Sequence, residues 1–358
     1  MNAGRQLHGA PAKTTCNVKC AFNEAVMTVS SPSTETTAAI ASILCPVKYG
    51  ECVSERYAKA AGPPRETMEI REVHRDMMDE VKAFLANRQD FCDPNNWDGL
   101  FNYPWKPERL PYGYAIFNQE KIVGFLGTIF SERRVDGKTW TCCNTTCWFV
   151  EPEFRNHMQT LKLFAPILKM KDLLITNMTP SDGVIGICKQ FGYRSLDQEQ
   201  VVLPVLPVPS VAFGKHLLVS FDPHKIKAHL TAEERTILKD HEGFKCKHFL
   251  IKEEDSGEHC YGIATALPMR RFQFLKGQWL NLCYLSNAQI FARNYRHIRI
   301  KLWREGRFFI LRYDARLIPR QLSRLAVRDE RLRQYKSAEL PPWTIDNLYS
   351  ELVTFNKY

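Results

Sequence analysis

The sequence predicts a mixed α+β fold made of two similar halves, each with a largely antiparallel central sheet flanked by helices. The first observation is the order of the predicted elements, strand–turn–strand–turn–strand–helix–strand, which occurs over residues 114–176 and again over residues 247–312. The second is a correspondence of residues about 140 positions apart, in which Gly124 matches Gly262 and Trp140 matches Trp279. A repeat of this length indicates two copies of one fold.

The domain boundaries follow from changes in composition along the 358 residues, a length that suits two domains. The N-terminal stretch is rich in Ser, Thr and Ala and has no amphipathic period, so we expect a disordered extension. A proline-rich segment is expected to join the two halves. The predicted division is an N-terminal extension over 1–65, a first domain over 66–202, a linker over 203–216 and a second domain over 217–358.

The spacing of apolar residues and the turn signals place the elements of each half. The first half is predicted to contain strands at 68–73, 114–117, 122–130, 139–150, 173–176 and 194–202, and helices at 76–85, 159–170 and 184–191, the last closed by Gly192. The second half is predicted to contain strands at 247–252, 261–267, 279–286 and 307–312, and a helix at 288–305 that ends at Gly306. An arginine-rich amphipathic helix is expected over 319–336.

The net charge of +10 favours acidic partners such as nucleotide cofactors, phosphorylated sugars, anionic lipid surfaces or nucleic acid, against the plain alternative of a basic surface. Nucleic acid is disfavoured because no recognised nucleic-acid motif accompanies the basic tail, whose arginines fit a solvated helix face. No apolar run approaches the ~20 residues of a membrane span. The N-terminal stretch lacks the pattern of a signal peptide, so we expect a cytoplasmic protein without a membrane span.

The twelve cysteines do not indicate a disulfide framework in a chain of this size. Cys16 and Cys20 have no matching second pair, and Cys142, Cys143 and Cys147 fall within a predicted strand, so none has the paired spacing of a zinc site. We therefore expect free or buried thiols and no metal.

One stretch organises the functional interpretation, from Cys147 to Thr160 with the sequence CWFVEPEFRNHMQT. It predicts a strand that stops at Pro152, turns at Arg155 and continues into a helix. The first N–H groups of a helix lack internal partners, and the helix dipole favours negative charge there. This junction is therefore a candidate anion site.

Several segments of the first half carry a family resemblance: IREVHRDMMDEVKAFL, YAIFNQEKIVGFLGTIF, KTWTCCNTTCWFV, FVEPEFRNH and LLITNMTPSDGVIGICKQFGYRSL. They resemble, in order, the first strand and helix, the central antiparallel strands, the pyrophosphate-binding junction and the fifth strand with its following helix in the GNAT superfamily of acyl-coenzyme A (acyl-CoA) N-acyltransferases. The resemblance covers residues 68–200 and extends to uncharacterised acyltransferase-like proteins of bacterial polysaccharide pathways. It implies two GNAT-like domains and acyl-CoA, acetyl-CoA or longer, as co-substrate.

The resemblance also implies a cofactor site around the junction. In that fold the fourth and fifth strands splay apart and leave backbone groups for the pantetheine arm, while the turn holds the pyrophosphate. The positions implied are Trp148, Phe149 and Val150 for pantetheine, Arg155, Asn156, His157, Met158 and Gln159 for the pyrophosphate, and Asn177 beside the thioester. Met158 and Thr160 stand where the family has small residues that let the backbone approach a phosphate, so a non-binding turn is the alternative.

The catalytic candidates are Tyr193 as general acid and Glu151 and His157 as bases, since acyl transfer needs a group that takes or returns a proton. The alternatives are a tyrosine packed on the sheet, a surface glutamate and a histidine that starts a helix. An aromatic stretch falls where the superfamily shapes its acceptor pocket, and aromatic faces suit sugar rings, although such residues also form cores. Its members are Trp97, Phe101, Tyr103, Trp105 and Tyr112.

The resulting expectation is an acyl-CoA-dependent N- or O-acyltransferase that acts on a polar acceptor, such as a sugar nucleotide, a polysaccharide precursor or another small molecule or glycan. The alternative is a catalytically inactive GNAT-like module that binds a partner or regulates. The second half has no Pro-x-x-Arg turn after Leu285-Ser286-Asn287, so we expect that it has lost its cofactor site and shapes the acceptor site instead.

Overall fold

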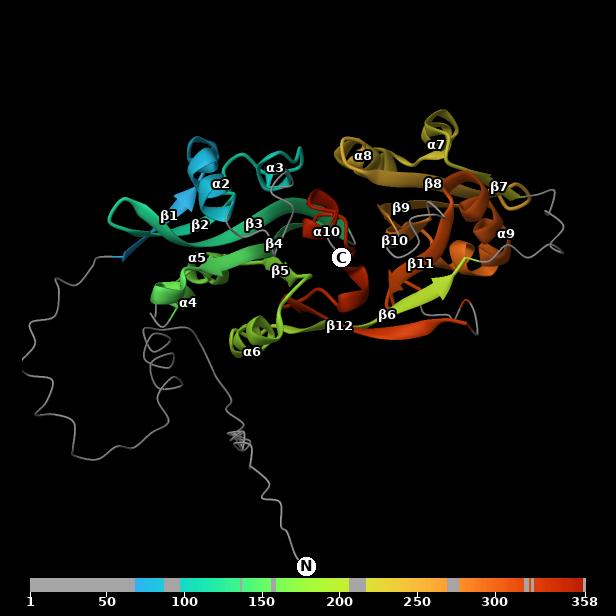
Figure 1. Cartoon of the computed structure of the whole chain (residues 1–358). Helices are drawn as coiled ribbons and strands as arrows, with labels where there is room; N and C mark the ends of the chain where they lie inside the picture. The colour runs from blue at the N-terminus through green and yellow to red at the C-terminus, as the bar shows by residue number, and fades with distance from the viewer. Residues whose placement is uncertain are drawn as a thin grey trace, which may run out of the picture. The chain divides into compact units, whose positions relative to one another are not determined.

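The described part of the chain forms one mixed sheet of twelve strands with helices on both faces (Figure 1). The computed structural model describes residues 68–86, 97–135, 137–155, 159–205, 217–268, 277–318, 322 and 325–356. All described residues belong to one compact unit within Pro64–Tyr358. The predicted N-terminal extension and residues 206–216 of the predicted linker lie outside the described residues.

The first half follows the predicted order of elements. Its strands are β1 (Met68–Val73), β2 (Gly113–Asn118), β3 (Lys121–Val135), β4 (Lys138–Val150), β5 (Leu173–Asn177) and β6 (Arg194–Pro204). Its helices are α2 (Met78–Ala86), α3 (Asp98–Phe101), α4 (Gln159–Lys162), α5 (Ala165–Lys169) and α6 (Asp182–Gln190), with 3-10 turns η1 (Arg75–Met77) and η3 (Pro152–Phe154). Gly192 ends the α6 region as predicted, with a φ of +83° that glycine adopts at little cost.

The helix predicted over 159–170 is divided into α4 and α5. Pro166 lies in the first turn of α5. A proline in a helix interior lacks its N–H and clashes with the carbonyl four residues earlier, here that of Lys162 at the end of α4. The prediction of one continuous helix over 159–170 was therefore wrong, because Pro166 interrupts it.

The second half has the four predicted strands and the helix predicted over 288–305. It adds three helices and an edge strand that the sequence analysis did not foresee, and a strand replaces the helix predicted over 319–336. Its strands are β7 (Leu217–Ser220), β8 (Cys246–Glu253), β9 (His259–Pro268), β10 (Gln278–Leu285), β11 (Phe308–Asp314) and β12 (Val327–Lys336). Its helices are α7 (Pro223–His229), α8 (Ala232–His241), α9 (Ala288–Gly306) and α10 (Glu351–Thr354), with the 3-10 turn η5 (Pro342–Thr344). Helix α9 includes Gly306, and the left-handed residue that ends it is Arg307, with a φ of 50°.

The strand order is symmetrical between the two halves. Counted inward from either edge, the first five strands of one half are followed by the last strand of the other half. The order is β1-β2-β3-β4-β5-β12-β6-β11-β10-β9-β8-β7. The neighbours β4 and β5 are parallel, as are β10 and β11, and the other neighbouring strands are antiparallel. Each half therefore contributes four antiparallel strands and one parallel neighbour. The two central strands, β12 and β6, each lie next to the fifth strand of the other half.

Strand β12 overturns the prediction of an arginine-rich helix over 319–336. Residues Val327–Lys336 form a strand that pairs with β5 on one side and β6 on the other. Strand formation depends on such neighbours more than on the local charge pattern, because the backbone groups of both flanking strands would otherwise lack partners. Arg333 of this strand is only 4% exposed and donates to Asp314 at 2.7 Å, so it is not part of a solvated face.

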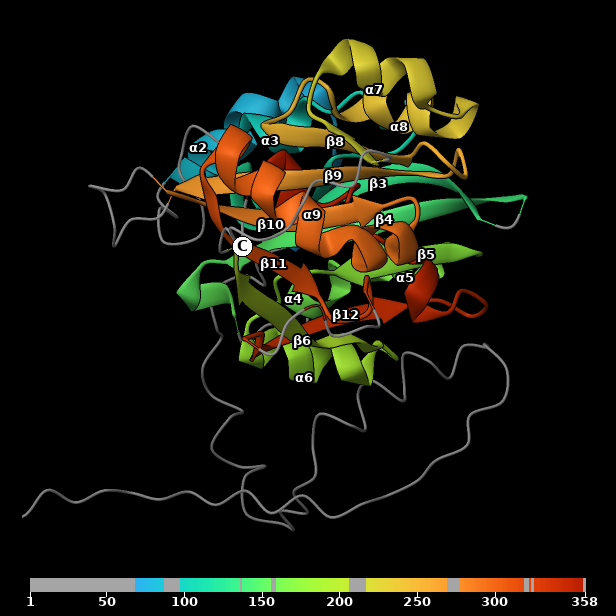
Figure 2. The same ribbon diagram turned by 90° about the vertical axis from the view of Figure 1, so that its right-hand side faces the viewer.

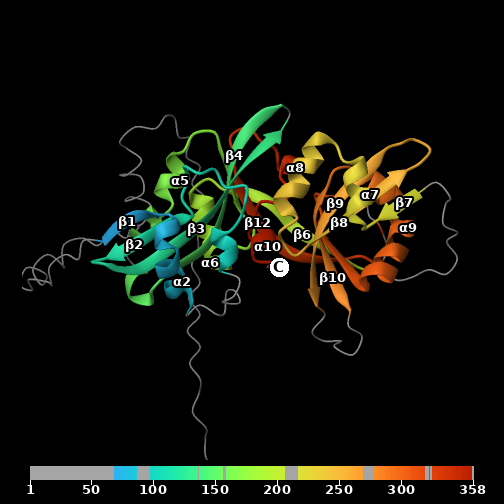
Figure 3. The same ribbon diagram turned by 90° about the horizontal axis from the view of Figure 1, so that it is seen from above.

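The helices divide between the two faces of the sheet. Helices α2, α3, α7 and α8 lie on one face (Figure 1; Figure 3 views the molecule from that side), in a shared core with the C-terminal residues Leu348, Val353 and Phe355. On the other face, the segment from α4 to α6 covers the first half, and α9 covers β8 to β11 of the second (Figure 2). This layering explains why the middle of β3 is buried on both sides.

The cysteines of the described residues are free thiols, as predicted, and all but Cys246 are buried.

Candidate functional site

The parallel strands β4 and β5 separate partway along their length. Their pairing runs from Thr141 opposite Leu173 to Asn144 opposite Thr176. At this end of the ladder, the Asn144 side-chain amide donates to the Thr176 hydroxyl at 3.2 Å, and the Thr145 hydroxyl donates to the Thr176 carbonyl at 3.1 Å. Beyond this point β4 runs on to Val150, so its edge residues toward β5 are outside that ladder.

A β-bulge lies within this separated part of β4. The register with β3 shifts between Phe125 and Gly127, and Cys147 takes a φ of 52°. A bulge bends a strand and redirects its side chains. Here Trp148 packs edge-to-face on Phe164 at 4.9 Å, in the core beneath α4 to α6, whereas Phe149 packs in the core on the opposite face.

A cavity of about 200 Å³ occupies the separation. We call it the donor cavity, after the acyl donor that the sequence analysis expects to bind here. The end of β4 forms one wall, and the end of β5 with the start of α6 forms the other. The indole Nε1 of Trp148 is buried without a hydrogen-bond partner among the described residues. The lining residues used below are Thr145, Trp148, Phe149, Asn177, Thr179 and Val184.

The turn after β4 only partly lies in the described chain. Arg155 follows η3, is exposed, and donates from Nε to the Val150 carbonyl at 3.0 Å. Asn156, His157 and Met158 fall outside the described residues, and Gln159 is described only as the first residue of α4. Of the residues predicted to hold the pyrophosphate, only the side chain of Arg155, which follows the end of β4, is described.

Asn177 lines the donor cavity, whereas Tyr193 is outside its lining and lies in the core near Thr145. Tyr193 is 4% exposed and packs in the core with Cys143 and Cys188. Burial raises the pKa of Tyr193, nearby Cys188 and Cys143 add to the rise, and the Thr145 hydroxyl opposes it. The tyrosine hydroxyl is therefore protonated at neutral pH. Asn177 donates to the Cys188 sulfur at 3.8 Å and lines the donor cavity.

Glu151 is placed away from the donor cavity. Its backbone N–H donates to the Val123 carbonyl of β3 at 2.9 Å, and its carboxylate lies 3.8 Å from the Lys121 ammonium. Both contacts direct the residue toward β3, whereas the donor cavity lies on the β5 side of β4.

The five aromatic residues predicted to bind substrate all lie in the hydrophobic core. Trp97, Phe101, Tyr103, Trp105 and Tyr112 are each at most 9% exposed. The ring of Trp105 stacks on His241 at 4.9 Å and meets Tyr349 edge-on at 5.0 Å. The Trp105 ring is therefore covered by rings from α8 and the C-terminal segment, and the rings of Phe101, Tyr103 and Tyr112 contact one another. These residues form part of the core, as the alternative interpretation of the sequence had it.

Two functional candidates escaped the sequence analysis, Thr179 and Glu351. Glu351 begins α10 and is fully buried. Its Oε1 accepts from the Thr179 hydroxyl at 2.9 Å, and its backbone N–H donates to Asn144 Oδ1 at 3.1 Å. The polar run Asn144-Thr145-Thr146 inside a buried strand was the available signal, because buried polar groups require partners.

Two solved structures resemble the chain at a TM-score of 0.50. One is a GCN5-related N-acetyltransferase from Anabaena variabilis, 11% identical over 76% of this chain and 73% of that chain. The other is a conserved protein from Enterococcus faecalis described as a probable N-acyltransferase, 10% identical over 77% of this chain and 74% of that chain. The fold is that of the GCN5-related N-acetyltransferases. Comparisons with protein-family models and with curated protein sequences give no match.

This acetyltransferase fold has a second strand separation, between β10 and β11 in the other half. Their pairing ends at Asn281 opposite Arg312, and the Arg312 guanidinium donates to Asn281 Oδ1 at 2.6 Å. Beyond this point the backbone N–H of Asn347 donates to the Cys283 carbonyl of β10 at 3.3 Å. The C-terminal segment therefore occupies part of the second separation.

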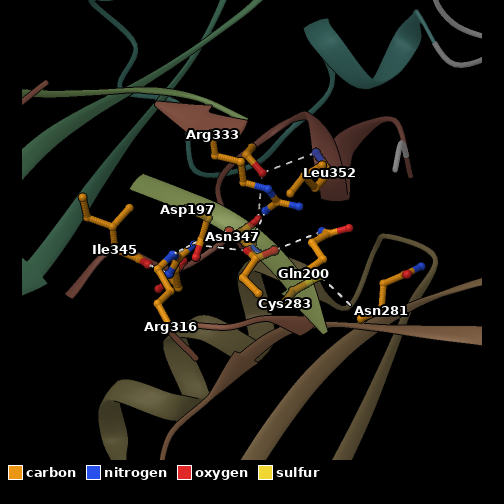
Figure 4. Close-up of polar contacts among 12 residues, drawn as sticks. Asp197, Gln200, Asn281, Cys283, Arg316, Arg333, Ile345, Asn347 and Leu352 are labelled. Carbon is orange, nitrogen blue, oxygen red and sulfur yellow. Dashed lines mark hydrogen bonds and ion pairs between the residues drawn. The ribbon is translucent and has the colours of Figure 1, made fainter. Parts of the chain in front are cut away.

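A buried ionic network fixes this C-terminal segment (Figure 4). Asp314 accepts from Arg333 at 2.7 Å and from Asn347 at 2.5 Å, and Gln200 donates to it at 3.0 Å. Arg316 donates to Asp197 at 2.5 Å and to the Ile345 carbonyl. Although burial opposes it, the two arginines hold the pKa of Asp314 below its ordinary value, whereas burial raises the pKa of Asp197 to about 6.

Within the described ranges, no group of three or more His, Cys, Asp or Glu side chains is placed to hold a metal ion. The helices of those ranges include none that is long and apolar enough to cross a membrane.

Proposed function

We propose that the protein is an acyl-CoA-dependent N- or O-acyltransferase that acts on a polar acceptor. The observation that carries the proposal is the separation of β4 from β5, with a cavity at the free edge of β4. An acyl-CoA has a long pantetheine arm with two amides, and an unpaired strand edge supplies N–H and C=O groups for such amides. The mostly apolar donor cavity with a few polar groups suits that arm.

The residues of the donor cavity fit an acyl-CoA in three respects. The backbone of Trp148, Phe149 and Val150 offers the strand edge, and the Trp148 Nε1 offers a donor that has no hydrogen-bond partner among the described residues. Arg155 offers a guanidinium for the pyrophosphate. Asn177 lies at the inner end, where the thioester would be held.

Direct transfer requires that the acceptor attack the thioester carbonyl and that a proton reach the departing sulfur. We propose that Tyr193 supplies this proton through the hydroxyl of Thr145, which lines the donor cavity. The raised pKa of Tyr193 keeps its proton available at neutral pH. Glu151, which faces Lys121, is not assigned a step, and His157 stays a prediction of the sequence.

We also propose that residues 66–202 and 217–358 are two copies of one fold, joined by the 203–216 linker. The symmetrical strand order supports this division. In the second copy the Asn347 hydrogen bond to Cys283 occupies the strand edge that the first copy leaves open. Only the first copy would then bind the acyl donor, while the second would shape the acceptor site.

The acceptor proposed from the sequence is a polar small molecule or glycan, such as a sugar nucleotide or a polysaccharide precursor in the cytoplasm. The buried aromatic residues give no support to a sugar platform on that stretch. The basic net charge of +10 supports an acceptor or donor that carries phosphate.

A catalytically inactive binding module is the second candidate. The observation in its favour is Thr160, which is 5% exposed in α4 and stands where the family turn has a small residue. A side chain there can narrow the turn that would hold the pyrophosphate.

Titration of the purified protein with acetyl-CoA and longer acyl-CoAs tests the proposal. A ligand that binds only the folded state raises the melting temperature, and calorimetry gives its affinity. The acyltransferase proposal predicts a shift with at least one thioester and release of free CoA when an acceptor is present. Binding without transfer to any acceptor would favour the inactive module, and no binding of any thioester would overturn both.

A further inference from the structure

A second cavity lies on the other side of β5. Strands β5 and β12 pair only where Ile175–Asn177 meets Gln334–Lys336. Beyond Asn177 the two chains diverge, and the register of β12 with β6 shifts between Glu330 and Arg333. A cavity of about 390 Å³ fills this divergence, a size that suits a small-molecule ligand. We call it the acceptor-side cavity.

The two cavities meet at the residues that follow β5. Thr179 and Pro180 line both of them. A donor in one cavity and an acceptor in the other would therefore approach each other at Thr179. The acceptor-side cavity is also lined by Leu352 of α10, which follows Glu351 directly.

At this meeting point, the Thr179 hydroxyl donates to the fully buried Glu351 carboxylate at 2.9 Å. A hydroxyl that donates to a carboxylate has oxygen lone pairs left to accept a proton from a third group. The pair is held in place because the backbone N–H of Glu351 donates to Asn144 at the end of the β4–β5 ladder. Such a fixed chain of hydrogen bonds can pass a proton inward.

Two arginines of the neighbouring strands are paired with other carboxylates. Arg133 of β3 forms an ion pair of 2.5 Å with Asp346, and Arg333 of β12 forms one of 2.7 Å with Asp314. Glu351 contacts the junction through Thr179, which lines both cavities, whereas the carboxylates of Asp182 and Glu330 line the acceptor-side cavity alone.

We infer that Thr179 is a catalytic residue that accepts the acceptor's proton and that Glu351 is the positioning residue that receives the proton from Thr179. This inference rests on the proposed acyl transfer. The acceptor nitrogen or oxygen attacks the thioester carbonyl carbon, its bond to carbon forms and the carbon–sulfur bond breaks. The acceptor's proton moves to Thr179 while the Thr179 proton moves to Glu351. The sulfur leaves as thiolate and takes the proton proposed to come from Tyr193.

The test uses acetyl-CoA and hydroxylamine, a nucleophile small enough to enter either cavity. Hydroxamate formation and free thiol are measured from about pH 5, where hydroxylamine is protonated and needs a base, to about pH 8, where it is neutral. Thr179→Val removes the hydroxyl while it keeps the shape, and Thr179→Ser keeps the hydroxyl. Acetyl-CoA affinity is measured for each variant by calorimetry.

The expected result is a kcat for Thr179→Val that falls more than tenfold at low pH and approaches the wild-type value at high pH. Thr179→Ser should retain the wild-type profile, and Glu351→Gln should reproduce the profile of Thr179→Val. The kcat values are compared at saturating acetyl-CoA, so that a change in donor affinity at this cavity-lining residue does not enter the profile. A wild-type pH profile in Thr179→Val, or no hydroxamate from a protein that binds acetyl-CoA, would overturn the inference. Absence of acetyl-CoA binding in the wild type would instead overturn the proposed function.

Discussion

The side-chain carbonyl of Asn144 accepts a 3.1 Å hydrogen bond from the backbone N–H of Glu351, which lies 207 residues further along the chain. This bond joins the point where β4 leaves β5 to the start of α10. Four residues earlier, Asn347 donates to Cys283 at the separation of β10 from β11. One short C-terminal segment therefore contacts both strand separations, leaving a cavity at the first and occupying part of the second.

Replacing Asn144 with alanine should destabilise the protein. The variant loses the acceptor of the Glu351 N–H and the donor to Thr176, and it leaves buried polar groups without partners. The expected loss in the free energy of unfolding is about 1–3 kcal/mol, measured by urea denaturation. Thr139→Ala, at an exposed position of the same strand, should change stability by less than about 0.5 kcal/mol. Equal effects of the two substitutions would contradict the role given to Asn144.

Arg316→Met should lower the stability of the protein more than Asn144→Ala does. It removes one arginine of the buried network and leaves Asp197 and the Ile345 carbonyl without that partner. Breaking a buried ion pair costs about 3–5 kcal/mol. The control is Arg293→Met, since Arg293 is an exposed arginine that pairs with Glu253 and Glu258, and solvent screening leaves exposed pairs a much smaller contribution to stability. A loss for Arg316→Met no larger than for Arg293→Met would show that the network does not hold the C-terminal segment.

Stability should fall as the pH is lowered from about 6.5 toward about 4. Burial lowers the pKa of His248 to about 4 and also lowers that of His241. In this range the unfolded chain binds protons that the folded chain excludes, so the unfolded state gains stability as the pH falls. Denaturation at pH 7 and pH 5 measures the effect, and His248→Gln should reduce the difference between the two. Asp197, whose pKa is raised to about 6, contributes with the opposite sign in this range. A pH dependence that His248→Gln leaves unchanged would therefore contradict a neutral buried His248.

Arg155→Ala should weaken acetyl-CoA binding by about 1–3 kcal/mol, the cost of losing a charged hydrogen bond. Calorimetric titration measures this change. Lys169→Ala, which removes an exposed charge from the last turn of α5, is the control for a general loss of positive charge. If both variants lose affinity equally, the contribution is long-range attraction and not a contact with the pyrophosphate.

The helices and strands that are determined by local sequence signals could be predicted from the sequence. The alternation over Met68–Val73 gave β1 with its bounds, and Gly192 correctly marked the end of the α6 region. Pro166 was a local signal that the prediction of a continuous helix over 159–170 ignored. The repeated order of elements was visible in each half because every element had its own apolar pattern.

What could not be predicted depends on contacts between distant parts of the chain. Strand β12 is charged along most of its length and forms a strand because β5 and β6 both require a partner there. Glu351 carries no motif, and its position next to Thr179 follows only from the packing of α10 against the end of β4. The aromatic stretch was ambiguous for a similar reason, since its covering rings come from α8 and from Tyr349.

The central claim, that one acyl donor binds in the separation of β4 and β5, is tested most directly by the stoichiometry of acetyl-CoA binding. Val184→Trp would fill the donor cavity from α6, and Ile187→Trp, one turn along the same helix and outside the cavity lining, is its control. Calorimetry should give one site per chain in the wild type and in Ile187→Trp, and no binding in Val184→Trp. Two sites per chain, or a site that survives Val184→Trp, would contradict the account.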